Sequence, residues 1–253
     1  MTNAALELDG VDVFRGEHAS EGAVVRGITL RITAGERVFL LGPNGAGKTS
    51  LLLSIVGAAR ASGIIRVGDT PLSPSTLDEI RRRVGFVFAD PRDQFFLDTA
   101  LSEVAFGPRQ RGLEEPEVLA RAERALRAVG LEELKARAPD TLSLGEQRRL
   151  AVATMLAVEP EVLLLDEPTA SLDPRARRQL LGVIAGLSAT VIVATHDLDA
   201  AYELGGRVLL LDGGRVVADG AAAELLESSA LLESAGLSLP IGVAARRRDD
   251  GAA

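Results

Sequence analysis

A glycine-rich segment at residues 42–49 constrains the fold of this chain more than any other feature. It reads Gly42-Pro43-Asn44-Gly45-Ala46-Gly47-Lys48-Thr49 and fits the pattern G-x-x-x-x-G-K-[ST] in full. An apolar run at residues 37–41 precedes it, and residues 48–56 have helical character. This context predicts a strand, a phosphate-binding loop and a helix, in that order, within an α/β domain that has a largely parallel sheet.

Each part of this loop suits the binding of a nucleotide triphosphate. Its glycines let successive backbone N–H groups point at phosphate oxygens, and the following helix adds the positive end of its dipole. Lys48 is predicted to reach the β- and γ-phosphates, Thr49 to bind Mg²⁺ through its hydroxyl, and Ser50 to add a phosphate contact. A glycine-rich turn that binds nothing is the alternative, and the loop alone does not separate ATPases from GTPases or kinases.

Two acids follow a second apolar run, at residues 162–165. Asp166 is predicted to hold Mg²⁺ through a water molecule. Glu167 is predicted to polarise the attacking water as general base, a role worth on the order of 10²–10⁴ in rate. A solvated strand end is the alternative interpretation, and the phosphate loop elsewhere in the chain favours the catalytic one.

A serine begins the helix predicted over residues 144–158. Ser143 and Glu146 have the spacing of a capping box, which by itself explains both residues. A helix start that contains Gly145 and an N-terminal serine also suits a second anion site. Two phosphate-binding helix ends in one chain suggest two copies that meet head to tail, with the Ser143 end of one copy closing over the nucleotide held by the other.

Composition restricts the partners of such a domain. The chain has 253 residues, a formal net charge of -8 and no cysteine. The acidic balance argues against a nucleic-acid partner, and the absence of cysteine excludes disulfides and thiolate metal sites. Residues 1–10 lack a signal-peptide core, and no apolar run approaches the roughly 20 residues that span a bilayer. We therefore expect a soluble protein that reaches any membrane through a partner.

The remaining pattern adds lobes to the α/β core. Alternating residues at 6–14 and 24–32 predict an antiparallel start. We predict a single domain over residues 1–240 with a helical subdomain at about residues 90–158. Charged residues without an apolar pattern predict a disordered tail over residues 241–253.

The order of the motifs resembles that of the ATP-binding-cassette (ABC) family, over the chain as far as about residue 232. The phosphate loop is followed by Leu142-Ser143-Leu144-Gly145-Glu146, by Asp166-Glu167, by Ala170-Ser171-Leu172-Asp173 and by a lone His196 after a strand. The resemblance implies the ABC ATPase fold: a P-loop NTPase core with a mostly parallel sheet, an N-terminal antiparallel β subdomain and an α-helical subdomain. It also implies a dimer that sandwiches ATP, with His196 contacting the γ-phosphate and Asp173 in a loop that couples the two sites.

The phenylalanine-rich stretch at residues 84–108 resembles the ATPases of energy-coupling-factor and cobalt/nickel importers. That resemblance implies a second ABC ATPase subunit, identical or different, together with integral membrane transporter subunits, and a peripheral position on the cytoplasmic face of the cell membrane. Phe86 and Phe88 are interpreted as core residues. Core packing and docking of a partner helix are equally good interpretations of Phe95, Phe96 and Phe106.

Ala89 departs from the family pattern at a position with chemical consequences. The family places a glutamine there, which contacts Mg²⁺ and the attacking water, and an alanine methyl offers no such contact. Asp90, Gln94 or a water molecule are the candidates to replace it.

Two smaller departures concern the nucleotide. Leu144 stands at a position that is commonly glycine, where a side chain would crowd the phosphate. Adenine usually stacks on an aromatic residue near the end of the first strand, where Phe14 and Arg15 are both candidates.

Two other functions stay open on the sequence alone. One is a weakly hydrolysing regulatory partner in a heterodimer, which Ala89 favours and Glu167 and His196 oppose. The other is a soluble non-transport ABC ATPase acting in DNA repair or on ribosomes. That function calls for coiled-coil insertions or two cassettes and for basic surfaces, which this sequence lacks.

Overall fold

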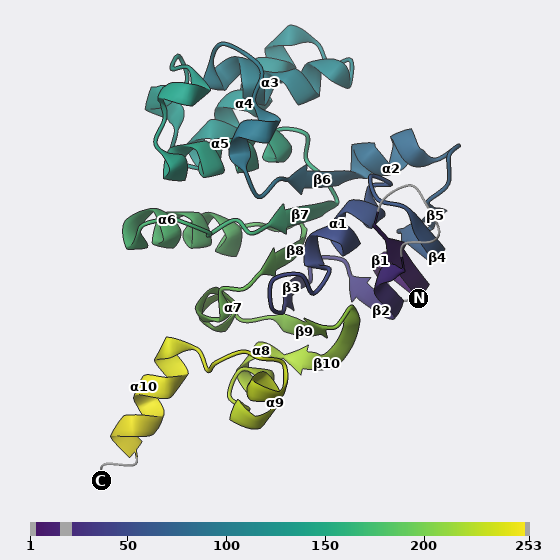
Figure 1. Ribbon diagram of the computed structural model, residues 1–253. Helices are drawn as coiled ribbons and strands as arrows, with labels where there is room; N and C mark the ends of the chain where they lie inside the picture. The colour runs from purple at the N-terminus through teal and green to yellow at the C-terminus, as the bar shows by residue number, and fades with distance from the viewer. Residues whose placement is uncertain (1–3, 16–21, 251–253) are drawn as a thin grey trace. The chain divides into compact units, whose positions relative to one another are not determined.

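The computed structural model describes residues 4–15 and 22–250, and within them the chain forms two compact units (Figure 1). The first unit takes residues up to 80 and from 190 onward, and the second takes residues 81–189. Both units combine strands with helices, so the predicted α/β class is confirmed. The helical subdomain predicted at about residues 90–158 falls within the second unit, while the single domain over residues 1–240 stays a prediction.

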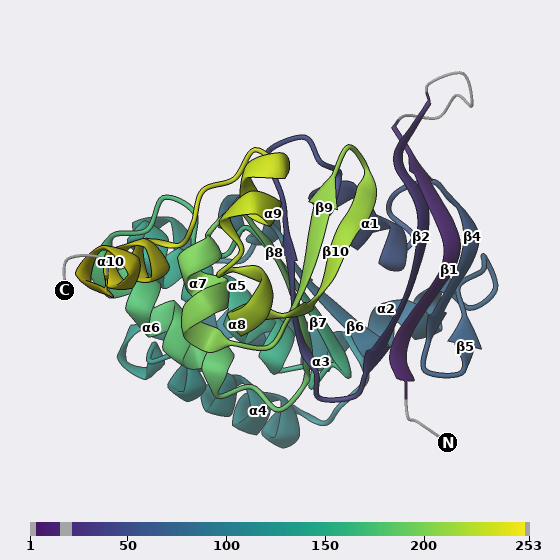
Figure 2. The same ribbon diagram turned by 90° about the horizontal axis from the view of Figure 1, so that it is seen from below.

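An antiparallel sheet forms one part of the first unit, and Figure 2 shows its strands running side by side. Its strands, in sheet order, are β2 (Ala23–Thr33), β1 (Ala4–Phe14), β4 (Ala61–Val67) and β5 (Thr70–Pro71). Leu6 and Leu8 of β1 are buried, and so are Val11 and Val13 beyond a register shift between Leu8 and Val11. The period of two in the sequence therefore becomes one apolar face of this sheet.

Parallel strands form the other part of the first unit. They are β3 (Arg37–Leu41), β8 (Thr190–Thr195) and β9 (Arg207–Asp212), and β10 (Arg215–Ala221) returns antiparallel to β9. β3 lies between β8 and β9, and it is buried from Val38 to Leu41. Because Leu41 is in register with Thr195, the segments that follow β3 and β8 leave the sheet at the same edge.

Short helices complete the first unit. They are α1 (Lys48–Ile55), α7 (Leu198–Leu204), α8 (Ala222–Leu225), α9 (Ser229–Ser234) and α10 (Ile241–Asp250), while α2 (Leu77–Arg83) lies at the sequence boundary with the second unit.

Helix α10 occupies residues for which the sequence predicts disorder. Val243 is 2% exposed, and the Arg246 guanidinium lies 5.2 Å from the centre of the Tyr202 ring and 3.1 Å from Glu227. These contacts join residues far apart in the sequence, so a local charge pattern does not indicate them. Residues 251–253 lie outside the described residues.

The second unit pairs two parallel strands with four helices. The strands are β6 (Val84–Val87) and β7 (Val162–Asp166), and the helices are α3 (Ala100–Gln110), α4 (Glu115–Ala128), α5 (Leu144–Leu156) and α6 (Pro174–Ala185). Helix α3 packs against α4 and α5 (Figure 1). Within the part of the chain that the structure describes, no helix has both the length and the apolar character of a membrane span.

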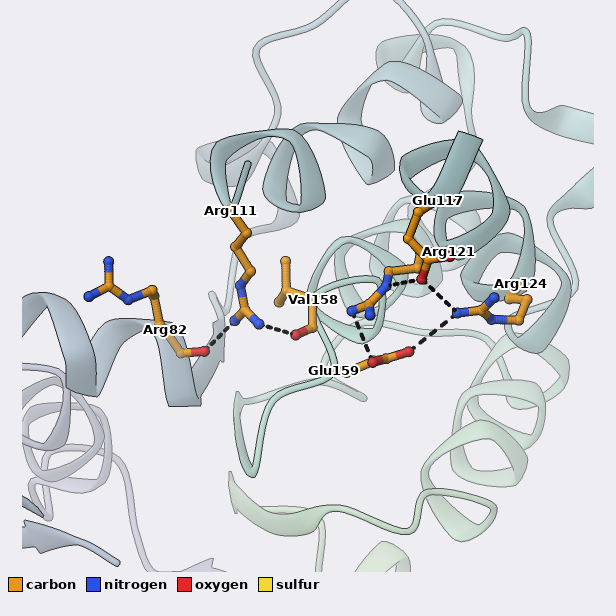
Figure 3. Close-up of polar contacts among 7 residues, drawn as sticks. All are labelled: Arg82, Arg111, Glu117, Arg121, Arg124, Val158 and Glu159. Carbon is orange, nitrogen blue, oxygen red and sulfur yellow. Dashed lines mark hydrogen bonds and ion pairs between the residues drawn. The ribbon is translucent and has the colours of Figure 1, made fainter. Parts of the chain in front are cut away.

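Arg111 joins the end of α3 to two other parts of the second unit (Figure 3). Its guanidinium donates to the main-chain oxygens of Val158 and Arg82. Burial lowers the pKa of Arg111, as expected for a charge taken out of water. The two bonds offset this desolvation by satisfying carbonyl groups at the ends of α2 and α5.

Ion pairs hold the segment after α5 beside α4 (Figure 3). Glu159 pairs with Arg121 at 2.9 Å and with Arg124 at 3.3 Å, and Arg121 also bonds Glu117 at 2.6 Å. Glu159 has a φ of 49°, a left-handed conformation that a non-glycine residue rarely adopts. We infer that the paired arginines help to keep this strained residue in place.

We predict that Arg111→Met lowers the free energy of unfolding by about 1–3 kcal/mol, because the carbonyl oxygens of Val158 and Arg82 lose their donor. Chemical denaturation checks this. The matched control is Arg109→Met, which removes an exposed ion pair with Glu115 and should change stability by less than about 1 kcal/mol. Equal losses in the two variants would contradict the role given to Arg111.

Candidate functional site

The structure divides the predicted site residues between the two units. The first unit carries Gly42, Pro43, Asn44, Gly45, Ala46, Gly47, Lys48, Thr49, Ser50 and His196, and the second carries Ser143, Gly145, Asp166, Glu167 and Asp173.

The phosphate loop turns from β3 into α1 at positions where only glycine fits. Gly42 has a φ of 154°, and a Cβ there would lie 2.1 Å from the carbonyl oxygen of Leu211. Gly47, which caps α1, has a φ of 102°, and a Cβ there would lie 2.6 Å from the Val25 side chain. The loop backbone is therefore pressed against β9 and β2, and its path depends on the missing side chains.

Lys48 is buried inside the curl of this loop, with 7% of its surface exposed. Its ammonium donates to the carbonyl oxygens of Gly42 at 2.8 Å and Pro43 at 3.2 Å. Thr49 is exposed and Ser50 half-buried on the first turn of α1. A buried cation beside hydroxyls at a helix N-terminus is suited to bind a polyphosphate.

His196 lies at the same sheet edge as the phosphate loop. It is exposed, and it directly follows β8, whose last residue Thr195 is in register with Leu41. The next residue, Asp197, caps α7 by accepting a hydrogen bond from the Ala200 N–H at 2.9 Å. Because Asp197 is the N-cap of α7, His196 lies between the end of β8 and the start of this helix. It is therefore at the sheet edge where the phosphate loop begins.

Phe14, one of the two candidates for stacking on adenine, carries a cation on its ring. The guanidinium of Arg60 lies 5.3 Å from the ring centre, and the Phe14 N–H donates to the Arg60 carbonyl oxygen at 2.9 Å. Arg15, the other candidate, is exposed. Arg60 was not predicted, because its contact with Phe14 comes from strand pairing and leaves no local mark in the sequence.

The two acids of the second unit differ in burial and backbone. Asp166 is the last residue of β7 and is 3% exposed. Glu167 is half-buried and has a φ of 45°, so the chain bends directly after Asp166. Its carbonyl oxygen accepts a hydrogen bond from Nη1 of Arg148 on α5, at 2.9 Å. The bend lets two neighbouring carboxylates serve different purposes.

Ser143 and Glu146 form the predicted capping box at the start of α5. The Ser143 hydroxyl donates to Oε2 of Glu146 at 2.8 Å and accepts from the Glu146 N–H at 3.4 Å. The bond from this hydroxyl lowers the pKa of Glu146. Leu144 is 37% exposed. At Gly145 a Cβ would lie 2.7 Å from Cβ of Ala176, so the close packing of α5 on α6 requires a glycine.

Asp173 caps α6, and its carboxylate accepts from the backbone N–H groups of Ala176 at 3.0 Å and Arg175 at 2.8 Å. These two bonds lower the pKa of Asp173. Ser171, two residues earlier, has a φ of 61°. The segment between β7 and α6 thus carries two non-glycine residues in left-handed conformations, Glu167 and Ser171.

The residues around Ala89 are engaged within the second unit. The Arg92 guanidinium bonds the Asp90 carboxylate at 2.6 Å and holds the pKa of that carboxyl at about 2. The Gln94 amide donates to the Thr154 hydroxyl at 2.5 Å and to the Ala151 carbonyl at 3.0 Å. The Asp90 carboxylate is thus engaged by Arg92, whereas the Gln94 amide oxygen is buried without a hydrogen-bond partner among the described residues.

An aromatic patch formed by Phe96 and Phe106 lies on the surface of the second unit. Phe96 is 65% exposed, and the two rings meet edge to face at 4.9 Å. Phe86 is buried as predicted, but the core position predicted for Phe88 is wrong, because this ring is 40% exposed beside Phe86. Phe88 is the first residue after β6, where the strand burial ends.

A buried carboxylate fixes the segment that carries Phe96. Glu103 is 3% exposed and accepts from the backbone N–H groups of Phe96 and Leu97. Burial raises the pKa of Glu103. The exposed ring of Phe96 is therefore held on an anchored backbone.

The fold and the loop define a P-loop nucleotide-binding protein. Comparison with known proteins narrows this class, because residues 25–170 match the family described as ABC transporter. The energy-coupling factor transporter ATP-binding protein EcfA of Carboxydothermus hydrogenoformans is 40% identical over 243 residues, covering 94% of this chain and 88% of the relative. This chain belongs to the ABC transporter family, as an ATP-binding subunit with ATPase activity.

Two solved structures share the fold. The first, cbiO1 from Clostridium perfringens, described as part of the ABC transporter complex cbiONQ, has a TM-score of 0.81 and 31% identity over 92% of this chain and 94% of its own. The second is a dimeric post-hydrolysis state of the ATP-binding cassette MJ0796 with ADP and Pi, with a TM-score of 0.77 and 28% identity over 86% of this chain and 98% of its own. The second of these structures is thus a dimer, and the first protein belongs to a transporter complex.

We predict that Gly145→Ala lowers the free energy of unfolding by about 1–3 kcal/mol, because the new methyl group overlaps Ala176. Thermal and chemical unfolding measure the loss. In the double variant Gly145→Ala/Ala176→Gly the overlap is gone, so the two changes should cost less together than their separate effects added. Additive effects would show that the helix contact does not require the glycine.

Proposed function

We propose that this protein is one of a pair of ATPases that enclose two Mg²⁺-ATP molecules and drive uptake through an importer of the energy-coupling-factor or cobalt/nickel type. The observation that supports the proposal is the presence in one chain of two different helix starts that are suited to bind phosphate. The loop around Lys48 belongs to the first unit, and the exposed Ser143 start of α5 belongs to the second. Two chains related head to tail can then complete each other's nucleotide sites.

Residues of the first unit hold the nucleotide in this proposal. Backbone N–H groups of residues 42–49 other than Pro43, together with the Lys48 ammonium, bind the β- and γ-phosphates, with Ser50 adding a hydroxyl. His196 contacts the γ-phosphate from the neighbouring strand end. Phe14, with Arg60 on its ring, is the surface on which adenine stacks.

The oxygen donors of the chain fit a magnesium ion. Thr49 offers an exposed hydroxyl on the first turn of α1, and Asp166 a buried carboxylate at the end of β7. Hydroxyl, carboxylate and phosphate oxygens are the hard ligands that Mg²⁺ prefers. When bound, the ion neutralises charge that develops on the phosphate oxygens.

Glu167 is the general base of the proposed reaction. It accepts a proton from the water that attacks the γ-phosphorus, and the β–γ bridging oxygen leaves with ADP. The Ser143 hydroxyl and the Gly145 N–H of the second copy bind the γ-phosphate from the other side. Asp173 of each copy lies in the segment that couples the two sites.

We propose that membrane subunits complete the transporter. Contact with these subunits would hold the protein on the cytoplasmic face of the cell membrane. The aromatic patch fits the apolar face of a helix from such a subunit, because exposed aromatic rings on an anchored backbone bind without much loss of entropy. The net charge of -8 opposes direct binding to anionic lipid.

One observation favours a second candidate function, a slowly hydrolysing partner in a heterodimer. Ala89 offers no oxygen to the metal or the water, and the Asp90 carboxylate is engaged by Arg92. Steady-state ATPase activity of the purified chain separates the two candidates, since a regulatory partner has little turnover by itself.

We predict that Glu167→Gln lowers kcat for ATP by at least about 100-fold, because an amide cannot accept the proton. ATP binding should persist, and the variant should accumulate as an ATP-bound dimer in size-exclusion chromatography with light scattering. Lys48→Ala is the control, and it should lose nucleotide affinity and therefore remain monomeric with ATP. Hydrolysis by Glu167→Gln at the parental rate would remove this residue as the base.

We also predict that Phe96→Asp reduces recovery of the protein with its membrane subunits at least about tenfold, because it puts a charge into an apolar interface. Detergent extraction and affinity purification from cells that express the whole transporter measure this. Leu119→Asp is the matched control, since Leu119 is also an exposed apolar residue (37%) of the second unit and lies on α4, outside the aromatic patch. Equal recovery of both variants would place the membrane contact elsewhere.

A further inference from the structure

Arg148 is a buried cation that the roles assigned above do not use. It lies on α5, is 7% exposed, and donates from Nη1 to the main-chain oxygen of Glu167 at 2.9 Å. Its Nε has no hydrogen-bond partner among the described residues. Removing a guanidinium from water without satisfying all its donors costs free energy, so the burial of Arg148 calls for an explanation.

The hydrogen-bond partner of Arg148 lies in the segment that carries the proposed general base, Glu167. The hydrogen bond from Arg148 is accepted by the main-chain oxygen of Glu167. Glu167 has a φ of 45°, a conformation that costs a non-glycine residue on the order of 1–3 kcal/mol. The charges that attract the guanidinium are the carboxylates of Asp90 and Glu167. The hydrogen bond of Arg148 therefore ties α5 to the segment after β7.

We propose that Arg148 is a positioning residue for Glu167. Its hydrogen bond to the Glu167 carbonyl oxygen holds the left-handed bend from which the carboxylate extends. The inference rests on the proposed assignment of Glu167 as general base. Because Ala89 supplies no polar group to align the attacking water, the alignment depends on how firmly Glu167 is held.

A purely structural role predicts a different outcome. Arg111 is also a partly buried arginine of the second unit that donates to main-chain oxygens, those of Val158 and Arg82 (Figure 3). If buried arginines only support the fold, Arg111→Met and Arg148→Met lower stability alike and leave kcat alike. A positioning role appears instead in kcat and depends on the presence of Glu167.

The test measures kcat and KM for ATP, together with thermal unfolding, for the full-length chain and four variants. They are Arg148→Met, Arg148→Lys, Glu167→Gln and the double variant Arg148→Met/Glu167→Gln, with Arg111→Met as control. We expect Arg148→Met to lower kcat about tenfold or more with KM within about twofold of the parent. Arg148→Lys should recover part of this loss, because an ammonium can donate to the same carbonyl.

The double variant gives the decisive comparison. If Arg148 acts through Glu167, removing both residues lowers kcat no further than Glu167→Gln alone. Parental kcat in Arg148→Met, a further loss in the double variant, or an equal loss in Arg111→Met would each overturn the inference and leave the base assignment intact. Parental hydrolysis by Glu167→Gln would instead overturn the base assignment, and the inference with it.

Discussion

The close approach of the backbone at Gly42 is the contact on which the nucleotide site depends. The Leu211 carbonyl lies where a side chain at residue 42 would be. The Val25 side chain lies where a side chain at residue 47 would be. Strands β9 and β2 therefore set the path of the loop from outside, and Lys48 fixes it from inside by bonding the Gly42 carbonyl. The loop is shaped by two sheets, so its N–H groups can be oriented before any phosphate arrives, which is the condition for electrostatic preorganisation.

Each unit contains one buried cation that bonds main-chain carbonyls beside a proposed reacting group. In the first unit this cation is Lys48, and in the second it is Arg148. A carbonyl bond satisfies part of the desolvated charge without neutralising it, unlike an ion pair with a carboxylate. The exposed pairs of the second unit, such as Arg109 with Glu115, contribute little by comparison because solvent screens them. Lys48 and Arg148 therefore keep their positive charges, which can attract a polyphosphate and a carboxylate in the proposed site.

The sequence predicts the structural features whose determinants are local, and it does not predict those that depend on tertiary contacts. The strand, loop and helix around residues 42–49 and the capping box at Ser143 follow from spacing, and the structure contains both features. Helix α3 was not identified, because Gly107 and Pro108 interrupt its helical pattern. The stacking of Arg60 on Phe14 and the packing of α10 depend on neighbours distant in sequence, and the exposure of Phe88 depends on where β6 ends. The roles of the site residues stay predictions, since their chemistry requires the nucleotide and a second copy.

The capping role of Ser143 is compatible with its proposed role in closing a second copy's site. The hydroxyl has one proton and two lone pairs, and the cap needs only a lone pair to accept from the Glu146 N–H. Its proton now bonds the Glu146 carboxylate, which is kept ionised by that bond and by the Ser143 N–H. If the Ser143 hydroxyl turns its proton to a phosphate, it exchanges one charge-assisted hydrogen bond for another, and α5 stays capped. Closing over the second copy's nucleotide therefore disrupts little of the structure around Ser143. The exposed Leu144 then sets how closely the phosphate approaches, because it adds a side chain where a glycine would leave the backbone open.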